Sequence, residues 1–322
     1  MRVGLDVFTL SPLGLGPYQV LDWLVGHDLE GVLFGRMEGV DPGLDPAALA
    51  DWRAAAEARG LFTDVSAPTA NPCLAADPAA LAAELTRHIE LAAGLGWHEL
   101  HSTLGDDATR YHHPVRWPEQ LRAAADFLRR LGPVLRANAS RLNLETHGDA
   151  TTFELVRLVE DVGPDIVGIC LDTANVLCHA EDPVLAARRA APYVHLTHAK
   201  DAALFFSPAG YTRQGKPVGG GILDWKLILA ALGEHSPDLR LTIEDHKWLF
   251  EFAIYDPWWR RQHPDLTVDE LARVVRLVGR CEQRYAEGVW PQPAAYEAVP
   301  YVEQLEARVA MGRDHLRAVL GR

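Results

Sequence analysis

The stretch RLNLETHGDATTFELVRLVEDVGPDIVGICLDT, residues 141–173, predicts a strand, a helix and a second strand in immediate succession. Apolar and polar residues alternate at its start, a helical pattern covers 152–162, and VGICLD is a short apolar run. Strands that alternate with helices in this way are typical of a parallel sheet. Polar residues follow both apolar strands at their ends, which is where parallel-sheet proteins carry functional groups.

The same pattern repeats along the chain and gives eight strand–helix units. Eight units at this chain length favour a closed barrel, so the predicted fold class is α/β, a (β/α)8 TIM barrel with a C-terminal helical extension. An open doubly wound sheet is the alternative, but the first strand is not followed by a GxGxxG phosphate turn. The expected strands are RVGLDVF (2–8), GVLF (31–34), LFTDV (61–65), HELHST (98–103), LNLETH (142–147), VGICLDT (167–173), YVHLTHAKD (193–201) and RLTIED (240–245).

Helix starts are marked by Asp-Pro pairs before Ala47, Ala79 and Val184, since proline suits the first helical turn. The expected helices between the strands cover 18–26, 46–60, 78–94, 118–137, 152–162, 183–189 and 225–232. We expect one domain over 1–322, with the barrel at about 1–246 and the extension at about 247–322.

The C-terminal extension is longer than one closing helix requires. It begins with HKWLFEFAIYDPWWRRQHPDLT (246–267) and continues with helical stretches at 267–285 and 302–320. Its aromatic residues are consistent with packing of the segment, with a subunit interface, or with a lid that stacks on a ligand. The residues concerned are Trp248, Phe250, Phe252, Trp258 and Trp259.

Composition limits the class of protein. The chain has 322 residues, 48% hydrophobic residues and a net charge of −13. An acidic chain lacks the basic face that a nucleic-acid backbone requires, and no apolar run is long enough to span a membrane. The four cysteines have no CxxC spacing, which argues against a disulfide framework or a thiolate zinc site. No secretory signal precedes the first strand, so we expect a cytoplasmic protein.

The last four strands each end in a residue that can bind a metal. In a closed barrel these ends meet at one face, so three carboxylates and an imidazole would converge there. A divalent cation would offset the cost of burying those charges. The oxygen-rich set favours Mn²⁺, with Mg²⁺, Co²⁺ or Zn²⁺ as alternatives. The proposed ligands are Glu145, Asp172, His198 and Glu244.

Taken singly, each ligand also has a structural explanation. Glu145 is consistent with a salt-bridge partner, Asp172 with a helix N-cap, His198 with a buried core histidine and Glu244 with a surface acid. In HLTH, His195 and His198 have opposite parity, so only one of them shares the ligand face. We choose His198 because it lies nearer the strand end.

These motifs resemble the xylose isomerase-like barrels, a family that includes sugar isomerases and epimerases, inosose dehydratases and, more distantly, endonuclease IV. The resemblance rests on LETH, LDTAN, HAKDA, PVGGGILDW and TIED, and covers about Val3 to Leu232 and then Arg240 to Asp245. It implies the same four metal ligands that the strand ends select. The segment GYTRQGKPVGGGILDW resembles the family's loop before helix seven, with Asp224 and Trp225 opening the helix.

One position departs from some family members. Endonuclease IV-like enzymes and several free-ketose epimerases have a histidine three residues after the strand-six aspartate, where this chain has Asn175. Together with the acidic charge, this argues against a nuclease and against a plain ketose 3-epimerase.

The expected chemistry is proton transfer beside a carbonyl. A bound metal would stabilise the enediolate formed when the neighbouring carbon loses its proton. Glu145 and Glu244 are expected to serve as acid and base on opposite faces, and His147, two residues beyond Glu145, to act on substrate without binding metal. Lys200 and Asp201 are expected either to touch substrate or to orient the ligands. Residues expected to contact substrate are Lys200, Trp248, His101 and Asn175.

Three functions follow in order. The first is a metal-dependent isomerase or epimerase acting on a sugar or sugar-derived ketone. The second is a metal-dependent lyase or dehydratase on a keto-sugar or 3-oxo-glycoside, because some relatives eliminate the aglycone from 3-oxo-glycosides with such a metal and histidine. The third is a non-catalytic ligand-binding barrel. Expected partners are the small-molecule substrate and either further copies of the chain or a small second subunit, with no nucleic acid and no membrane.

Overall fold

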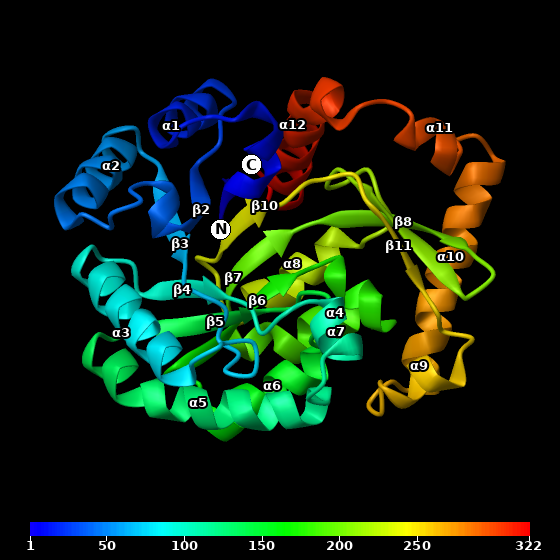
Figure 1. The fold of residues 1–322 in the computed structure, drawn as a ribbon. Helices are drawn as coiled ribbons and strands as arrows, with labels where there is room; N and C mark the ends of the chain where they lie inside the picture. The colour runs from blue at the N-terminus through cyan, green and yellow to red at the C-terminus, as the bar shows by residue number, and fades with distance from the viewer.

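The computed structural model describes residues 1–322 and contains a closed barrel of eight parallel strands (Figure 1). Around the barrel the order is β1-β10-β7-β6-β5-β4-β3-β2, so each strand neighbours the one before it in the barrel and the last returns to the first. The predicted (β/α)8 fold is confirmed. The barrel strands are β1 (Arg2–Asp6), β2 (Gly31–Arg36), β3 (Phe62–Ser66), β4 (Glu99–Ser102), β5 (Arg141–Glu145), β6 (Val167–Asp172), β7 (Val194–Ala199) and β10 (Arg240–Ile243).

Helices surround the strands and begin where the Asp-Pro pairs predict. The carboxylates of Asp45, Asp77 and Asp182 each accept a hydrogen bond from a backbone N–H of the first helical turn. The helices that follow the strands are α1 (Pro17–Gly26), α2 (Pro46–Ala58), α3 (Pro78–Gly94), α4 (Asp107–His112), α5 (Trp117–Ala137), α6 (Thr152–Val162), α7 (Pro183–Ala190) and α8 (Trp225–Gly233). The short 3₁₀ helices are η1 (Val7–Leu13), η2 (Met37–Gly39), η3 (Asn175–His179) and η4 (Ala191–Tyr193).

A second sheet stands beside the barrel and differs from the prediction. The chain leaves β7, pairs β8 (Asp201–Phe206) with β9 (Tyr211–Lys216) as an antiparallel hairpin, and later adds β11 (Leu249–Phe252) to β9. The segment predicted as a loop before helix seven is therefore a strand over its first part, and the expected seventh strand is divided at Lys200. The SPAG turn between β8 and β9 was the available signal.

The last helix completes the barrel. After α9 (Pro257–Arg261), α10 (Val268–Ala286) and α11 (Pro293–Glu297), helix α12 (Tyr301–Val319) returns to pack against β1, β10, α8 and η1. Figure 1 shows α12 among the ring helices, next to α1, whereas α10 lies against the second sheet. Residues 302–320 thus belong to the ring, because β1 and β10 need a helix on their outer face, and the extension proper lies between β10 and α12.

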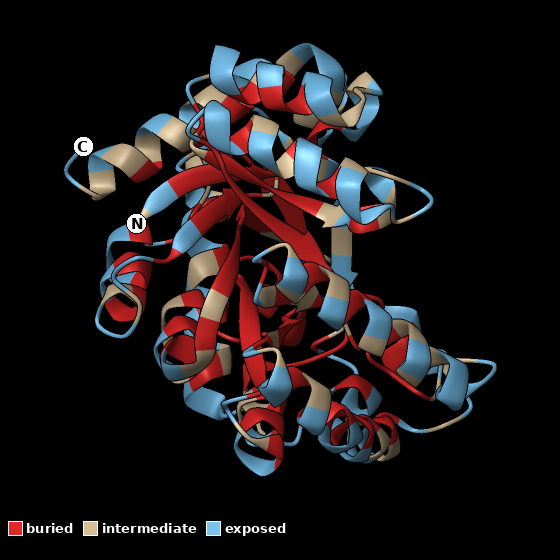
Figure 2. Cartoon of the chain, turned by 90° about the vertical axis from the view of Figure 1, so that its left-hand side faces the viewer, coloured by how far each residue is buried: buried red, intermediate tan, exposed pale blue.

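The core runs between strands and helices. One cluster of 74 buried apolar residues joins the outer faces of the strands to the helices, and Figure 2 shows the strands buried and the outer helix faces exposed. Inside the barrel a small separate cluster contains Leu33, Cys170 and Leu196. The positions above this inner cluster are polar, which leaves the C-terminal ends of the strands for the site. No helix combines the length and the apolar character needed to cross a membrane.

Candidate active site

The four predicted metal ligands meet at the C-terminal ends of their strands. Glu145 ends β5, Asp172 ends β6, His198 lies near the end of β7 and Glu244 directly follows β10. One potential ligand atom from each residue lies within 4.8 Å of the others, and all four residues are largely buried. His198 Nδ1 is 3.1 Å from Glu145 Oε1 and 3.0 Å from Glu244 Oε2.

Neighbouring residues hold these side chains in place. His101 on β4 contacts Glu145 Oε2 through Nε2 at 2.9 Å, while its Nδ1 contacts Ser66 Oγ at 2.8 Å. Asp172 Oδ1 accepts from the backbone N–H groups of residues 174 and 175 at 2.9 and 2.8 Å. Asp6 Oδ2 lies 3.4 Å from His198 Nε2, behind the ring. Such outer contacts fix the orientation of metal-binding side chains.

Several buried atoms of this cluster have no hydrogen-bond partner. They are Asp172 Oδ2, Glu244 Oε2 and both ring nitrogens of His198. Unpartnered buried polar atoms are costly in a folded protein, and their convergence on one point supports a cation there. The three carboxylates and one imidazole fit a divalent metal, and this donor set does not by itself select which one.

His195, the other histidine of HLTH, lies elsewhere. Its ring contacts Arg141 and lines a separate pocket that also contains Glu99 and Arg240. That pocket includes Arg2 and Phe62, from the N-terminal ends of the strands. Of the two histidines, only His198 joins the carboxylate cluster, as the sequence analysis expects.

The charges of the cluster depend on one another. Burial favours the neutral form of Glu145, yet the charges of His198 and His147 and the hydrogen bond from His101 hold its pKa well below the usual range. Burial raises the pKa of Asp172 and outweighs the nearby Lys200. Burial disfavours charged Lys200, but Asp172 and Glu244 raise its pKa above the ordinary value. Opposite charges therefore share this buried centre in a balanced arrangement.

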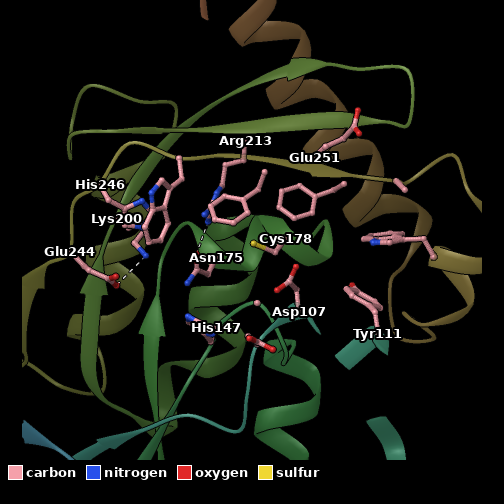
Figure 3. Close-up of a pocket in the computed structure, with 17 residues that line it drawn as sticks. Asp107, Tyr111, His147, Asn175, Cys178, Lys200, Arg213, Glu244, His246 and Glu251 are labelled. Carbon is pink, nitrogen blue, oxygen red and sulfur yellow. Dashed lines mark hydrogen bonds and ion pairs between the residues drawn. The ribbon is translucent and has the colours of Figure 1, made fainter. Parts of the chain in front are cut away.

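A cavity of about 370 Å³ opens beside the cluster (Figure 3). Glu244, Lys200 and His147 line it, whereas Glu145 and Asp172 do not. His147 is oriented by its Nδ1, which contacts the carbonyl oxygen of Gly105 at 2.9 Å, so its other ring nitrogen is free to face a ligand. Burial disfavours the imidazolium, but Glu145 and Asp149 outweigh it and raise the pKa of His147. His147 and Glu244 are thus the two proton-carrying groups best placed to reach a ligand.

Lys200 and Asn175 line the cavity as expected. Lys200 Nζ lies 2.7 Å from Asp172 Oδ2 and 3.0 Å from Glu244 Oε2, so it also neutralises the cluster. Asn175 Oδ1 accepts from Arg213 Nη1 at 2.6 Å. Arg213, on β9, is 3% exposed and stacks on Phe250 with 4.9 Å to the ring centroid. Sequence reasoning missed Arg213 because β9 was read as a loop.

The two other predicted substrate contacts differ. Trp248 lines the cavity at its rim and is 49% exposed, with its ring 4.2 Å from that of His246. His101 lies behind Glu145 and does not line the cavity, because the β4 strand end points it at the ligand cluster. Lining residues that the sequence analysis did not single out include Asp107, Tyr111, Cys178, His246 and Glu251.

Fold and site define a (β/α)8 barrel with a carboxylate-rich candidate metal centre at the C-terminal ends of its strands. A sequence model of the family described as xylose isomerase-like TIM barrel matches residues 22–253, and the chain belongs to this family. The predicted family is confirmed.

Named relatives point to carbohydrate chemistry. The chain is 26% identical over 167 residues to 3-oxo-isoapionate decarboxylase of Pectobacterium atrosepticum, which is 51% of this chain and 57% of that protein. The chain matches between 30% and 57% of the lengths of its curated relatives.

Two solved structures share the fold. D-psicose 3-epimerase, in the presence of D-fructose, has a TM-score of 0.66 at 16% identity, covering 100% of both chains. The IOLI protein with a bound zinc atom has a TM-score of 0.60 at 14% identity, covering 87% of this chain and 99% of the other. Together with the ligand cluster, the zinc-bound neighbour supports a divalent metal in this chain.

Proposed function

We propose that this chain is a divalent-metal-dependent isomerase or epimerase that moves a proton at the carbon beside a carbonyl group of a sugar or sugar-derived ketone. The observation that carries the proposal is that His147 and Glu244 line one cavity directly beside the ligand cluster. The names of the relatives support a carbohydrate substrate.

The chain's own residues divide the work. Glu145, Asp172, His198 and Glu244 would hold the cation, which when bound supplies Lewis-acid polarisation of a carbonyl oxygen. Lys200 donates to oxygen atoms that become negative, and His147 takes the proton from carbon on its free ring nitrogen. Return of that proton, from His147 or from Glu244, decides between isomer and epimer. Glu145 does not line the cavity, so we assign it to metal binding alone.

Proton exchange tests this function. The Mn²⁺-loaded protein is incubated in D₂O with ketoses, inososes and 3-oxo-glycosides, and deuterium at carbon is followed by NMR. His147→Asn is expected to slow exchange by about 10²–10⁴-fold, the usual contribution of general acid–base catalysis. Glu244→Gln should abolish it, while exposed His235→Asn serves as the matched control. Exchange that persists in both site variants would refute the proposal.

A lyase is the second candidate, favoured by the decarboxylase relative and by the two buried cations on the cavity wall, Lys200 and Arg213. Cations there would stabilise a carboxylate or an anionic leaving group. Product analysis separates the two functions, because only a lyase releases a second fragment.

Thermal melts address the non-catalytic alternative. Mn²⁺ at 100 times its dissociation constant should stabilise the fold by about 2.7 kcal/mol and raise Tm. A melting temperature that ignores Mn²⁺ and EDTA alike would favour a binding protein without metal.

A further inference from the structure

The cavity beside the metal cluster has a polar end and an aromatic wall. The polar end contains Glu244, Lys200 and His147. The aromatic side chains come mainly from the extension between β10 and α12, with one from α4, and are Tyr111, Trp248, Phe250, Phe252 and Trp259. Figure 3 shows Tyr111 and Glu244 at opposite sides of the cavity. A ligand that fills it therefore meets two chemically different regions.

Strand β11 gives the aromatic wall its length. Trp248, Phe250 and Phe252 occupy alternate positions, so they share one face of this strand, and all three line the cavity. At about 3.3 Å per residue the three side chains extend over roughly 13 Å. A six-membered ring is only about two C–C bonds of ~1.5 Å across. The wall is thus longer than one sugar ring needs.

These rings are available to a ligand. Trp248 is 49% exposed and forms the rim, and Trp248 and Phe250 meet edge to face at 6.0 Å between ring centroids. Phe250 and Phe252 are half-buried. Aromatic faces prefer offset-stacked or edge-to-face partners to aliphatic ones, so the wall favours a further ring.

The charge around the aromatic wall restricts that ring. Asp106, Asp107 and Glu251 line the cavity and are exposed. Figure 3 shows Asp107 and Glu251 on opposite sides of the space, on the side away from Glu244. Three carboxylates would repel an anionic group and would accept hydrogen bonds from a neutral one.

We propose that the substrate carries a neutral aryl group, linked to its reacting carbohydrate part, and that this group packs on the wall formed by Trp248, Phe250 and Phe252. The inference rests on the proposed function for the polar end of the cavity. It gives the extension a role: β11 builds a subsite for the non-reacting half of the substrate.

Equilibrium binding tests the subsite without turnover. Methyl, cyclohexyl, phenyl and 4-carboxyphenyl 3-oxo-β-D-glucopyranosides are titrated by calorimetry into the metal-free protein and the Mn²⁺-loaded Glu244→Gln variant. The phenyl compound is expected to bind about tenfold more tightly than the methyl compound, and more tightly than the cyclohexyl and carboxyphenyl compounds. The ratio of phenyl to methyl affinity should fall below about threefold in Trp248→Leu and Phe250→Leu. It should remain in Tyr255→Leu, which removes a 53% exposed ring of the same segment outside the cavity.

Clear outcomes overturn the inference. Equal affinity for methyl and phenyl compounds, no measurable binding of the phenyl compound at millimolar concentration, or an unchanged ratio in both wall variants would each do so. Circular dichroism spectra confirm that the variants are folded. If proton exchange fails for every compound while the aryl preference persists, the proposed function is wrong and the subsite stands. If exchange occurs with no aryl preference, the subsite is wrong and the function stands.

Discussion

His101 illustrates how one residue outside the cavity can control the site. Its ring bridges Ser66 and Glu145, with contacts of 2.8 and 2.9 Å, so the carboxylate of Glu145 is fixed before any ion binds. The sequence analysis expected His101 to contact substrate. Its position makes it a residue that orients a proposed metal ligand instead.

Substitution of His101 is expected to weaken metal binding. His101→Ala should lower Mn²⁺ affinity by about 10–100-fold, because contacts of this kind orient metal ligands. His101→Gln, which can still donate to Glu145, should lose less. Calorimetric titration with Mn²⁺ measures the change, and His98→Ala, at an exposed position three residues earlier, is the control. Equal Mn²⁺ affinity of all three variants would contradict the role.

Asp149 carries a buried carboxylate whose two oxygens have no hydrogen-bond partner. Burial raises its pKa from 3.8 to about 6, despite the charge of the nearby His147. Because the folded pKa lies above the unfolded value, the unfolded chain releases this proton first. The fold therefore loses stability as pH rises from about 4 to about 6, and the loss is constant above that range.

Asp149→Asn removes this titration. Its free energy of unfolding relative to the natural chain should rise between pH 4 and pH 8 by on the order of 2 kcal/mol. Urea unfolding at the two pH values measures the difference, and Asp314→Asn, at a side chain 65% exposed, is the control. A pH-independent difference would show that the carboxylate finds a partner in solution.

At the scale of elements, the hairpin β8–β9 and the loop that follows it depend on Asp201. Its carboxylate accepts hydrogen bonds from the backbone N–H groups of Gly219, Gly221 and Leu223 and from Trp225 Nε1. Gly219 has φ of +80°, and a side chain at Gly221 would collide with Asp201. This explains the glycines of PVGGG: the chain must approach the carboxylate closely.

Asp201→Ala should leave these buried donors without an acceptor. We expect a loss of about 3 kcal/mol in the free energy of unfolding, since each unsatisfied buried donor costs roughly 1–3 kcal/mol and the loop relaxes in part. Urea denaturation provides the measurement. In the same loop, Asp224→Ala removes only the N-cap contact to Leu227 and should cost about 1 kcal/mol. Similar losses for the two variants would refute the central role of Asp201.

For the whole molecule, closure of the barrel connects the last helix to the site. Arg308 on α12 forms a buried pair with Asp245, with Nε–Oδ2 at 2.5 Å and Nη2–Oδ1 at 2.7 Å. Asp245 directly follows Glu244, so the final ring helix also fixes the backbone of a proposed metal ligand. The C-terminus is therefore part of both the fold and the site.

Arg308→Met should destabilise the fold by about 3–5 kcal/mol, because it leaves the Asp245 charge buried and unpaired. The double variant Arg308→Met/Asp245→Leu should be more stable than the single one, and a double-mutant cycle in urea measures the coupling. On the same helix, Arg317 pairs with Asp28, whose side chain is 76% exposed, so Arg317→Met should cost less than about 1 kcal/mol. Additive losses across the cycle would exclude a coupled pair.

The sequence by itself determined the barrel and most of the ligand cluster. Strand period, helix caps and the polar residue at each strand end are local features, and in a closed parallel barrel all strand ends meet at one face. Glu145, Asp172, His198 and Glu244 could therefore be selected without coordinates. Only the tertiary structure decided what long-range packing controls: the pairing of β11 with β9, the return of α12 to β1, the arrival of Arg213 beside Asn175, and the place of His101 behind Glu145. These contacts join residues distant in the chain, and no local pattern encodes their partners.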